Sequence, residues 1–216
     1  MPDFSLEDAV SGLSIGVDEA GRGPWAGPVS VAACWLDRTQ PQHIPDGLDD
    51  SKKLSAARRA DMYARLTTGP HIYSLTHVDV ATIDRIGLLK ATLAAMADVA
   101  ASLATRLHAA GHGPVAQMLV DGNQMPPTDL PAQCVIGGDA ISMNIAAASI
   151  IAKHSRDAVM IDLDRAFPGY GWARNMGYGT AQHRTAIDAL GITIHHRRSF
   201  APIRRHLEAV QSAASQ

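Results

Sequence analysis

The chain has little of several residue types. Among its 216 residues there are two cysteines, Cys34 and Cys134, and only 5% are aromatic. Two cysteines are too few for a disulfide framework or a cysteine zinc site, so we expect two reduced thiols in a protein of the cytoplasm. Charged residues make up 19% and hydrophobic residues 46%. This balance excludes a disordered chain and allows a sizeable packed core.

Signals for export and for membrane insertion are also missing. Residues 1–13 hold three acids and no basic start before an apolar stretch, so we expect no secretory signal. The most apolar stretches, 88–107 and 141–152, are interrupted by polar or charged residues, and we expect no membrane contact. No internal repeat or low-complexity linker divides the chain, which predicts a single domain over residues 1–216.

The net charge of −2 hides an uneven distribution. Residues 171–216 hold six arginines against two acids, so this part carries +4 and the remainder −6. An acidic site can bind cations while a basic part binds phosphates. From about residue 171 onward we expect a small basic helical part packed on the main domain. Its arginines are expected to bind a nucleic-acid backbone: Arg197, Arg198, Arg204 and Arg205.

Short apolar runs alternate with longer helical patterns. The pattern predicts strands over 13–18, 28–36, 71–78, 116–121 and 133–137. It predicts helices over 55–67, 81–110 with a break near Gly87, 140–167, 180–190 and 202–214. Because the first three strands are close together in sequence, we expect an antiparallel meander that feeds a mixed sheet. The prediction is an α/β fold with a mixed five-stranded sheet flanked by helices.

Acids follow several of the expected strands. Asp18 and Glu19 end an apolar run, and Asp121 and Asp139 lie at or just past the ends of two others. If the strands of Asp18 and Asp121 are parallel neighbours, both carboxylates emerge at one edge of the sheet. Glu19 joins them only where its strand ends or bends, because neighbouring residues on a strand point to opposite faces.

Four clustered carboxylates repel one another unless they are protonated or bind cations. Oxygen ligands without cysteine or histidine favour Mg²⁺ or Mn²⁺ over zinc. Two such ions about 3.5–4 Å apart can activate a water and stabilise the leaving oxygen in phosphodiester cleavage. The acids therefore suggest a two-metal hydrolase, with solvated turn residues as the alternative reading.

A loop rich in glycine and proline follows the first two acids. Gly21, Arg22 and Gly23 allow the backbone to approach a ligand closely, although a tight turn would need the same glycines. The run also imitates a dinucleotide-binding fingerprint. Pro24 and Pro28 fall where the phosphate-binding helix should begin and continue, which disfavours a nicotinamide-dependent oxidoreductase.

Other polar residues have two open interpretations. Lys52 and Lys53 either hold phosphate or are simply solvated. Ser149, Lys153 and Arg156 lie on or near one helix after the last acid, where they either support the site or the core.

Three ring-bearing residues are expected to be structural. For His183 and His196 we expect hydrogen-bonded structural roles, and for Trp25 a place in the core.

Several sequence blocks, in order over most of the chain, together resemble the ribonuclease HII family, the type 2 ribonucleases H. The first are GVDEAGRGPWAGPV at 16–29, DSKKLS at 50–55 and VDGN at 120–123. GD at 138–139 follows, with IAAASIIAK at 145–153 and RD at 156–157. The last are GYGT at 177–180 with His183, and HRRSF at 196–200.

The resemblance implies a ribonuclease H-like fold and an endoribonuclease that hydrolyses the RNA strand of RNA–DNA hybrids. It also implies cleavage 5′ to a single ribonucleotide in duplex DNA, which leaves 3′-hydroxyl and 5′-phosphate ends and serves primer removal and ribonucleotide excision. Its catalytic, metal-binding acids correspond to Asp18, Glu19, Asp121 and Asp139, with two Mg²⁺ or Mn²⁺ ions as cofactors. We expect the protein to act as a monomer.

The resemblance also implies how RNA is selected. The loop that resembles Gly21, Arg22 and Gly23 contacts the ribose 2′-hydroxyl and flanking phosphates, and the tyrosine that resembles Tyr178 stacks on the sugar beside the RNA–DNA junction. This agrees with the 2′-hydroxyl being the group that distinguishes RNA from DNA.

Two alternatives remain open at this point. One is another two-metal nuclease of the same fold type, which the loop and Tyr178 disfavour because plain DNA cleavage needs neither. The other is a non-catalytic hybrid-binding module, which the four acids disfavour because negative charge near phosphates weakens binding.

Overall fold

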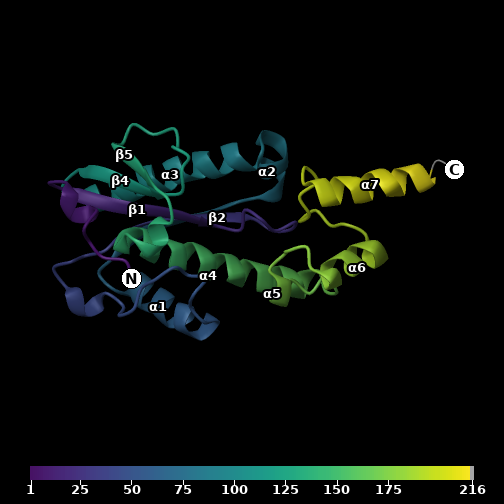
Figure 1. Ribbon diagram of the computed structural model, residues 1–216, viewed down its shortest axis with the longest axis horizontal. Coiled ribbons are helices and arrows are strands. Elements are labelled where there is room, and N and C mark those ends of the chain that lie inside the picture. The colour runs from purple at the N-terminus through teal and green to yellow at the C-terminus, as the bar shows by residue number, and fades with distance from the viewer. Residues whose placement is uncertain (215–216) are drawn as a thin grey trace.

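A five-stranded mixed sheet forms the centre of the computed structural model, which describes residues 1–214 (Figure 1). The strands are β1 (Leu13–Ala20), β2 (Val29–Trp35), β3 (Ile72–Val78), β4 (Val115–Asp121) and β5 (Ala132–Val135), and their order in the sheet is β3-β2-β1-β4-β5. β2 pairs antiparallel with β1 and β3, whereas β4 pairs parallel with β1 and β5. The predicted meander and mixed sheet are confirmed.

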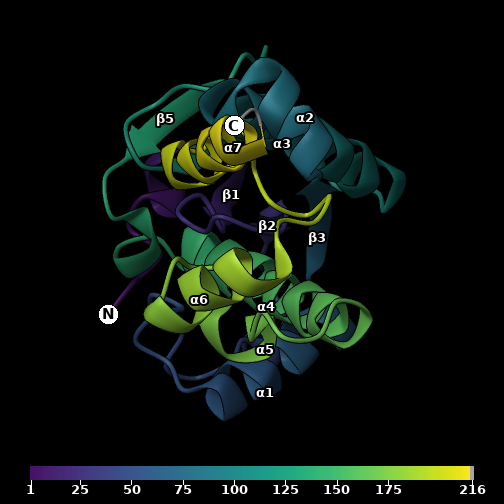
Figure 2. The same ribbon diagram turned by 90° about the vertical axis from the view of Figure 1, so that its right-hand side faces the viewer.

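Helices cover both faces of the sheet (Figure 2). On one face α3 (Leu88–Ala109), preceded by the short α2 (Val80–Ile86), packs on β2 and β3. On the other face α4 (Met143–Ala166) packs on β1 and β2 and is flanked by α1 (Ala56–Thr68). Gly87 lies between α2 and α3 with φ +87°, so the predicted break in this helical region is confirmed.

Two apolar layers hold these helices to the sheet. By length and composition α3 matches a membrane-spanning helix. Its buried residues, such as Val99 and Leu103, instead share one core cluster with Ile15 and Val17 of β1. On the opposite face the alanine-rich side of α4 packs with α1 and β2 in a second cluster. Burial of each large aliphatic side chain stabilises such layers by roughly 1.5–3 kcal/mol.

The start of α4 is fixed by side-chain caps. The Ser142 hydroxyl accepts a hydrogen bond from the Ile145 amide at 3.2 Å and donates one to the Glu7 carboxylate at 2.6 Å. The same carboxylate accepts from the Asn144 amide at 2.9 Å. The helix therefore begins after Ser142, later than the predicted start at 140, and the 3₁₀ turn η3 (Gly138–Ala140) precedes it.

The C-terminal part lies beyond the edge at which β1 ends (Figure 1). It contains α5 (Trp172–Asn175), which the sequence pattern did not predict, α6 (Ala181–Leu190) and α7 (Ala201–Ala214). Backbone hydrogen bonds join it to the loop after β1. The Gly27 amide donates to the His195 carbonyl at 2.9 Å, and the Trp25 amide donates to the Gly177 carbonyl at 2.8 Å.

Candidate active site

A cavity of about 220 Å³ opens where the pairing between β1 and β4 ends. The pairing of these parallel strands stops at Val17 and Val120, so Asp18 and Asp121 follow directly where the strands separate. β1 itself continues beside β2 through Glu19 to Ala20. The expected strand end at Asp18 is therefore wrong, yet both neighbouring acids line the cavity because β4 has left the pair by then.

Most of the predicted site residues meet in this cavity. Its lining includes Asp18, Glu19, Asp121, Lys52, residues 21–23 and Tyr178. Asp139 lies next to the lining in η3, within ion-pair distance of Lys52.

Asp18 is the most deeply buried acid that lines the cavity, with 3% of the residue exposed. Its Oδ1 accepts a hydrogen bond from the Glu19 amide at 2.6 Å. Burial first, and then the negative charges of Glu19 and Asp121, raise the pKa of Asp18 well above its ordinary value. Burial also raises the pKa of Glu19, although the Arg22 guanidinium 3.5 Å away acts in the opposite direction. A bound cation would favour the charged forms of Asp18 and Glu19 and so lower the pKa of both.

The other two acids are linked to each other and to a lysine. Asp121 Oδ1 accepts a hydrogen bond from the Gly138 amide at 2.7 Å, and Asp139 Oδ2 lies 3.5 Å from Lys52 Nζ. Burial, and then the charges of Asp121 and Asp50, raise the pKa of Asp139. Burial alone would lower the pKa of Lys52, but Asp50 and Asp139 outweigh it and the pKa is raised. Lys52 thus acts as a counter-ion for the acids.

The donor set suits a hard divalent cation. The acids offer carboxylate oxygens only, and no histidine or cysteine lines the cavity. Within residues 1–214, no three aspartate, glutamate, histidine or cysteine side chains already converge on one ion position. Asp121 faces the Gly138 amide and Asp139 faces Lys52, so both would have to turn toward a shared cation.

Two nearby lysines have acidic partners of their own. Lys53 Nζ lies 2.9 Å from Asp49, and Lys53 does not line the cavity. Lys153 lines it but pairs with Asp157 at 2.6 Å, one turn further along α4. Lys52 is therefore the predicted phosphate-binding lysine that the structure brings to the acids.

Two buried arginines hold the loop after β1 from behind. Arg197 is fully buried and donates to the carbonyl oxygens of Gly21, Arg22, Gly27 and Pro28 at 2.7–3.0 Å. The expectation that Arg197 binds a nucleic-acid backbone is therefore wrong, because its guanidinium is enclosed by protein carbonyls.

The second buried arginine, Arg156, is 1% exposed and donates to the carbonyls of Ala26, Pro28 and Met176 at 2.9–3.2 Å. Burial lowers the pKa of Arg156 to about 10 and that of Arg197 to about 9, so both remain charged at neutral pH. Of the two interpretations left open for Arg156, the structure supports the one in which it supports the site.

Tyr178 lies against the loop and is itself held by histidines. Its half-exposed ring is so close to Gly23 that a Cβ there would lie 3.2 Å from Tyr178 Cε1. The Tyr178 carbonyl lies 3.0 Å from His183 Nδ1. His183 Nε2 accepts from Trp172 Nε1 at 3.0 Å and lies 3.1 Å from His196 Nε2. Burial lowers the pKa of both histidines, that of His196 to about 3, and their predicted structural roles are confirmed.

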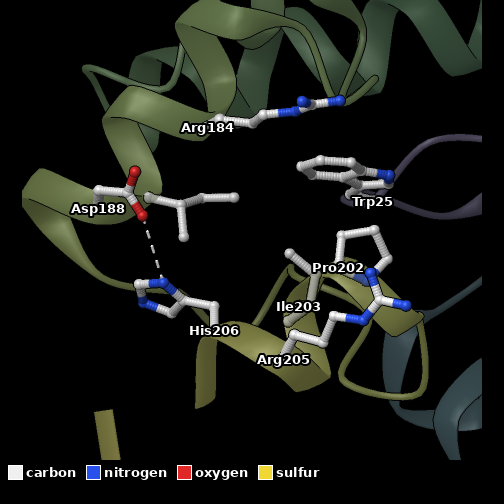
Figure 3. A pocket seen from close by; sticks show the side chains of 8 residues that line it. Trp25, Arg184, Asp188, Pro202, Ile203, Arg205 and His206 are labelled. Carbon is white, nitrogen blue, oxygen red and sulfur yellow. Dashed lines mark ion pairs between the residues drawn. The ribbon is translucent and has the colours of Figure 1, made fainter. Parts of the chain in front are cut away.

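A second cavity, of about 350 Å³, lies between α6 and α7 (Figure 3). Half-buried Trp25 forms one wall, and the Arg184 guanidinium lies over its ring, 5.3 Å from the centroid. Arg205 reaches the cavity from α7, and an Asp188–His206 pair at 3.5 Å lies on its far side. Trp25 packs against the core cluster of the C-terminal part but is only half-buried, so its expected core position is confirmed in part. The sequence analysis did not predict a role for Arg184. Its position could have indicated one, because Arg184 lies in the first turn of the helix that follows the 177–180 block.

Comparison with known proteins supports one family. The sequence model described as Ribonuclease HII matches residues 15–203. The Ribonuclease HII of Rhodospirillum rubrum is 52% identical over 210 residues, which cover 96% of this chain and 92% of the relative. Among solved structures, the ribonuclease H2 from Pyrococcus horikoshii aligns with a TM-score of 0.71 at 21% identity, over 92% of this chain and 98% of that one.

A further solved structure, Bst-RNase HIII in complex with Mn²⁺, aligns with a TM-score of 0.75 at 22% identity, over 98% of this chain and 75% of that one. These structural likenesses confirm the ribonuclease H-like fold. The family model spans most of the chain, and a relative of similar length shares half of its residues. The chain is therefore an enzyme, a ribonuclease that belongs to the ribonuclease HII family.

Proposed function

We propose that this enzyme hydrolyses the RNA strand of RNA–DNA hybrids and cuts on the 5′ side of single ribonucleotides in duplex DNA. The products would carry 3′-hydroxyl and 5′-phosphate ends. The observation that carries the proposal is one cavity lined both by acids and by the loop and tyrosine that resemble the family's RNA-selecting elements. One chain supplies this whole lining, which supports action as a monomer, and its two cysteines are free, which fits the cytoplasm.

We propose Asp18, Glu19, Asp121 and Asp139 as the residues that hold two Mg²⁺ or Mn²⁺ ions. The raised pKa values of Asp18, Glu19 and Asp139, caused by burial first and then by neighbouring negative charges, support cation binding at this position. The bound ions would supply a water-derived nucleophile and stabilise the departing 3′ oxygen. The Mn²⁺ complex of a structural neighbour, Bst-RNase HIII, supports a metal at a site of this fold.

The cations of the cavity have a complementary task. Lys52 lies 3.5 Å from Asp139, and Arg22 lies 3.5 Å from Glu19. The Lys52 side chain is largely exposed and that of Arg22 half exposed, so both can leave these carboxylates and contact a substrate phosphate instead. Residues 21–23 and Tyr178, which line the same cavity, would bind the ribose.

Cleavage of matched duplexes tests this function. The substrates are a labelled DNA duplex with one ribonucleotide and the same duplex made only of DNA, each with Mg²⁺, Mn²⁺ or EDTA. We expect one metal-dependent cut 5′ to the ribonucleotide and an intact all-DNA duplex. Cutting of both duplexes would instead indicate a general two-metal nuclease, and binding without any cutting would indicate a non-catalytic module.

The cavity between α6 and α7 suggests where the duplex continues. Arg184 and Arg205 have no carboxylate partner within residues 1–214, and both flank the ring of Trp25 (Figure 3). Each phosphate contact contributes about 0.9 to the slope of log binding constant against log salt concentration. We therefore expect the Arg184→Gln, Arg205→Gln double variant to bind substrate with a slope that is smaller by up to about 1.8, because it loses up to two phosphate contacts.

The matched control for this double variant is Arg38→Gln, which removes a charge beyond the other end of β2. Filter binding between low and moderate salt measures both slopes. Equal slopes for wild type, control and double variant would remove this cavity from the substrate path.

A further inference from the structure

The loop after β1 has an unusual hydrogen-bond pattern. Between residues 21 and 28, six carbonyl oxygens accept hydrogen bonds from Arg156 or from the side chain or backbone of Arg197: those of Gly21, Arg22, Trp25, Ala26, Gly27 and Pro28. Apart from the backbone bond of Arg197 to Trp25, all come from two buried guanidinium groups. The carbonyl side of the loop is thus turned into the protein.

The amide side of the same peptides faces the other way. Every peptide bond within residues 1–214 is trans, and in a planar trans peptide the carbonyl and the following N–H point in opposite directions. Since the carbonyls of Gly21 and Arg22 point to Arg197, the amides of Arg22 and Gly23 point away from it. Neither amide has an acceptor within residues 1–214, and both residues line the cavity.

The two arginines make this orientation firm. Neither forms an ion pair with a carboxylate within the described part of the chain, so carbonyl oxygens accept all the hydrogen bonds of the two guanidinium groups. More distant acids, Asp157 for Arg156 and Asp84 for Arg197, and the Phe200 ring beneath Arg197 add to this stabilisation. A buried charge with too few partners is costly, so any flip of a loop peptide away from Arg197 is opposed. A lysine could not reproduce this, because only the planar guanidinium spans several acceptors at fixed angles.

The same clamp extends to the tyrosine. Arg156 Nη1 donates to the carbonyl of Met176, two residues before Tyr178, at 3.0 Å. The Trp25 amide donates to Gly177. The loop and the tyrosine therefore keep a fixed relation, in which Gly23 lies beneath the Tyr178 ring.

We propose that Arg197 is a positioning residue for RNA selection, which turns the carbonyls of residues 21 and 22 inward so that two free amides and the Tyr178 ring face the ribose. The proposal rests on the proposed function. Arg197 does not line the cavity, so any effect of its substitution on selectivity must pass through the loop.

Competition kinetics test the proposal with active enzyme. One measures kcat/KM for a duplex with one ribonucleotide, together with the inhibition constant of the same duplex made only of DNA. For Arg197→Lys we expect kcat/KM to fall by about 10- to 100-fold, the size of one or two lost charge-assisted hydrogen bonds. The inhibition constant for all-DNA duplex should change less than about twofold. Arg38→Gln, which removes an exposed charge beyond the far end of β2, should leave both kcat/KM and the inhibition constant close to wild type.

The outcomes distinguish a failure of the proposed function from a failure of the positioning role of Arg197. If wild type does not prefer the ribonucleotide duplex, the proposed function fails. If wild type prefers it and Arg197→Lys keeps that preference, only the positioning role fails. Equal loss on both duplexes together with a lower melting temperature would show general loosening of the fold and would also overturn the positioning role.

A measurement on wild type covers the case in which the variant does not fold. Amide hydrogen exchange by NMR should find the Arg22 and Gly23 amides unprotected in the free enzyme, because they lack acceptors. They should become protected when a ribonucleotide-containing duplex binds in the presence of Ca²⁺, used as a probe ion to slow cleavage. Protection of either amide in the free enzyme, or no added protection in the complex, would overturn the proposed geometry.

Discussion

Asp18→Asn should lose cleavage by about three orders of magnitude or more and at the same time make the protein more stable. The loss follows from the proposed role, because several kcal/mol of transition-state stabilisation depend on the metal-binding acids, and each 1.4 kcal/mol is tenfold in rate. The gain follows from the buried position of Asp18, whose raised pKa means that its charged form is disfavoured in the folded state.

The pH dependence of this stability gain has a definite sign. The pKa of Asp18 is higher in the folded than in the unfolded chain, so its cost to stability grows as pH rises above about 4. At pH 8 in metal-free buffer we expect the melting temperature of Asp18→Asn to exceed that of wild type. The difference should be roughly 2–4 °C for each kcal/mol by which the substitution removes the cost of the buried charge. Below about pH 4, where Asp18 is protonated in both states, we expect no difference. Added Mn²⁺ should raise the melting temperature of wild type more than that of the variant.

Asp61→Asn is the control, because Asp61 is an exposed acid on α1. It should leave both cleavage and melting temperature close to wild type. Near-normal turnover of Asp18→Asn would remove Asp18 from the proposed catalytic set, whatever its effect on stability.

Gly21→Ala should damage both stability and cleavage. Gly21 has φ +98°, a conformation that costs an alanine roughly 1–2 kcal/mol. A Cβ at this position would also overlap Nε and Cδ of the buried Arg156 side chain, and such overpacking adds about 1–3 kcal/mol. Because Arg156 holds three carbonyls of the loop and the tyrosine segment, we expect kcat/KM to fall by about 10²-fold, the effect of a displacement of about 1 Å.

Gly111→Ala is the control that distinguishes the backbone strain of a positive φ from the steric overlap with Arg156. Gly111 has a similar φ of +84°, but a Cβ added at this position would have no atom within 4 Å of it. It should show the backbone cost alone, in chemical denaturation, and normal cleavage. If Gly21→Ala behaved like Gly111→Ala in both measurements, the contact between Gly21 and Arg156 would carry no functional weight.

The meeting of the acids was within reach of sequence reasoning. Each follows a recognisable apolar run, and adjacent parallel strands bring such residues to one edge. Asp18 and Asp121 do follow the last paired residues of β1 and β4. The approach of Glu19 was harder to predict, because it depends on the pairing of β4 with β1 ending at Val120 while β1 continues beside β2.

The support of the loop was beyond that reasoning. Arg197 stands in a run of basic residues, a pattern typical of a solvated surface, and only the tertiary fold shows that its side chain is buried while that of Arg198 is exposed. The four-residue helix α5 and the half-buried position of Trp25 depend in the same way on contacts between distant segments. Local sequence patterns do not predict contacts between residues that are far apart in the chain.

The hydrogen bond between Arg197 and Gly21 spans 176 positions of the chain, so under the proposed role of Arg197 the order of synthesis would decide when the enzyme becomes selective. All four acids have been synthesised by residue 139, and Arg197 is the 58th residue after Asp139. At usual elongation rates a ribosome needs roughly 3 to 12 seconds for that stretch. Throughout this interval the nascent chain holds the acids but lacks the arginine that sets its loop. Under the proposed role of Arg197, the ability to tell ribose from deoxyribose would therefore be acquired only after the acids are in place.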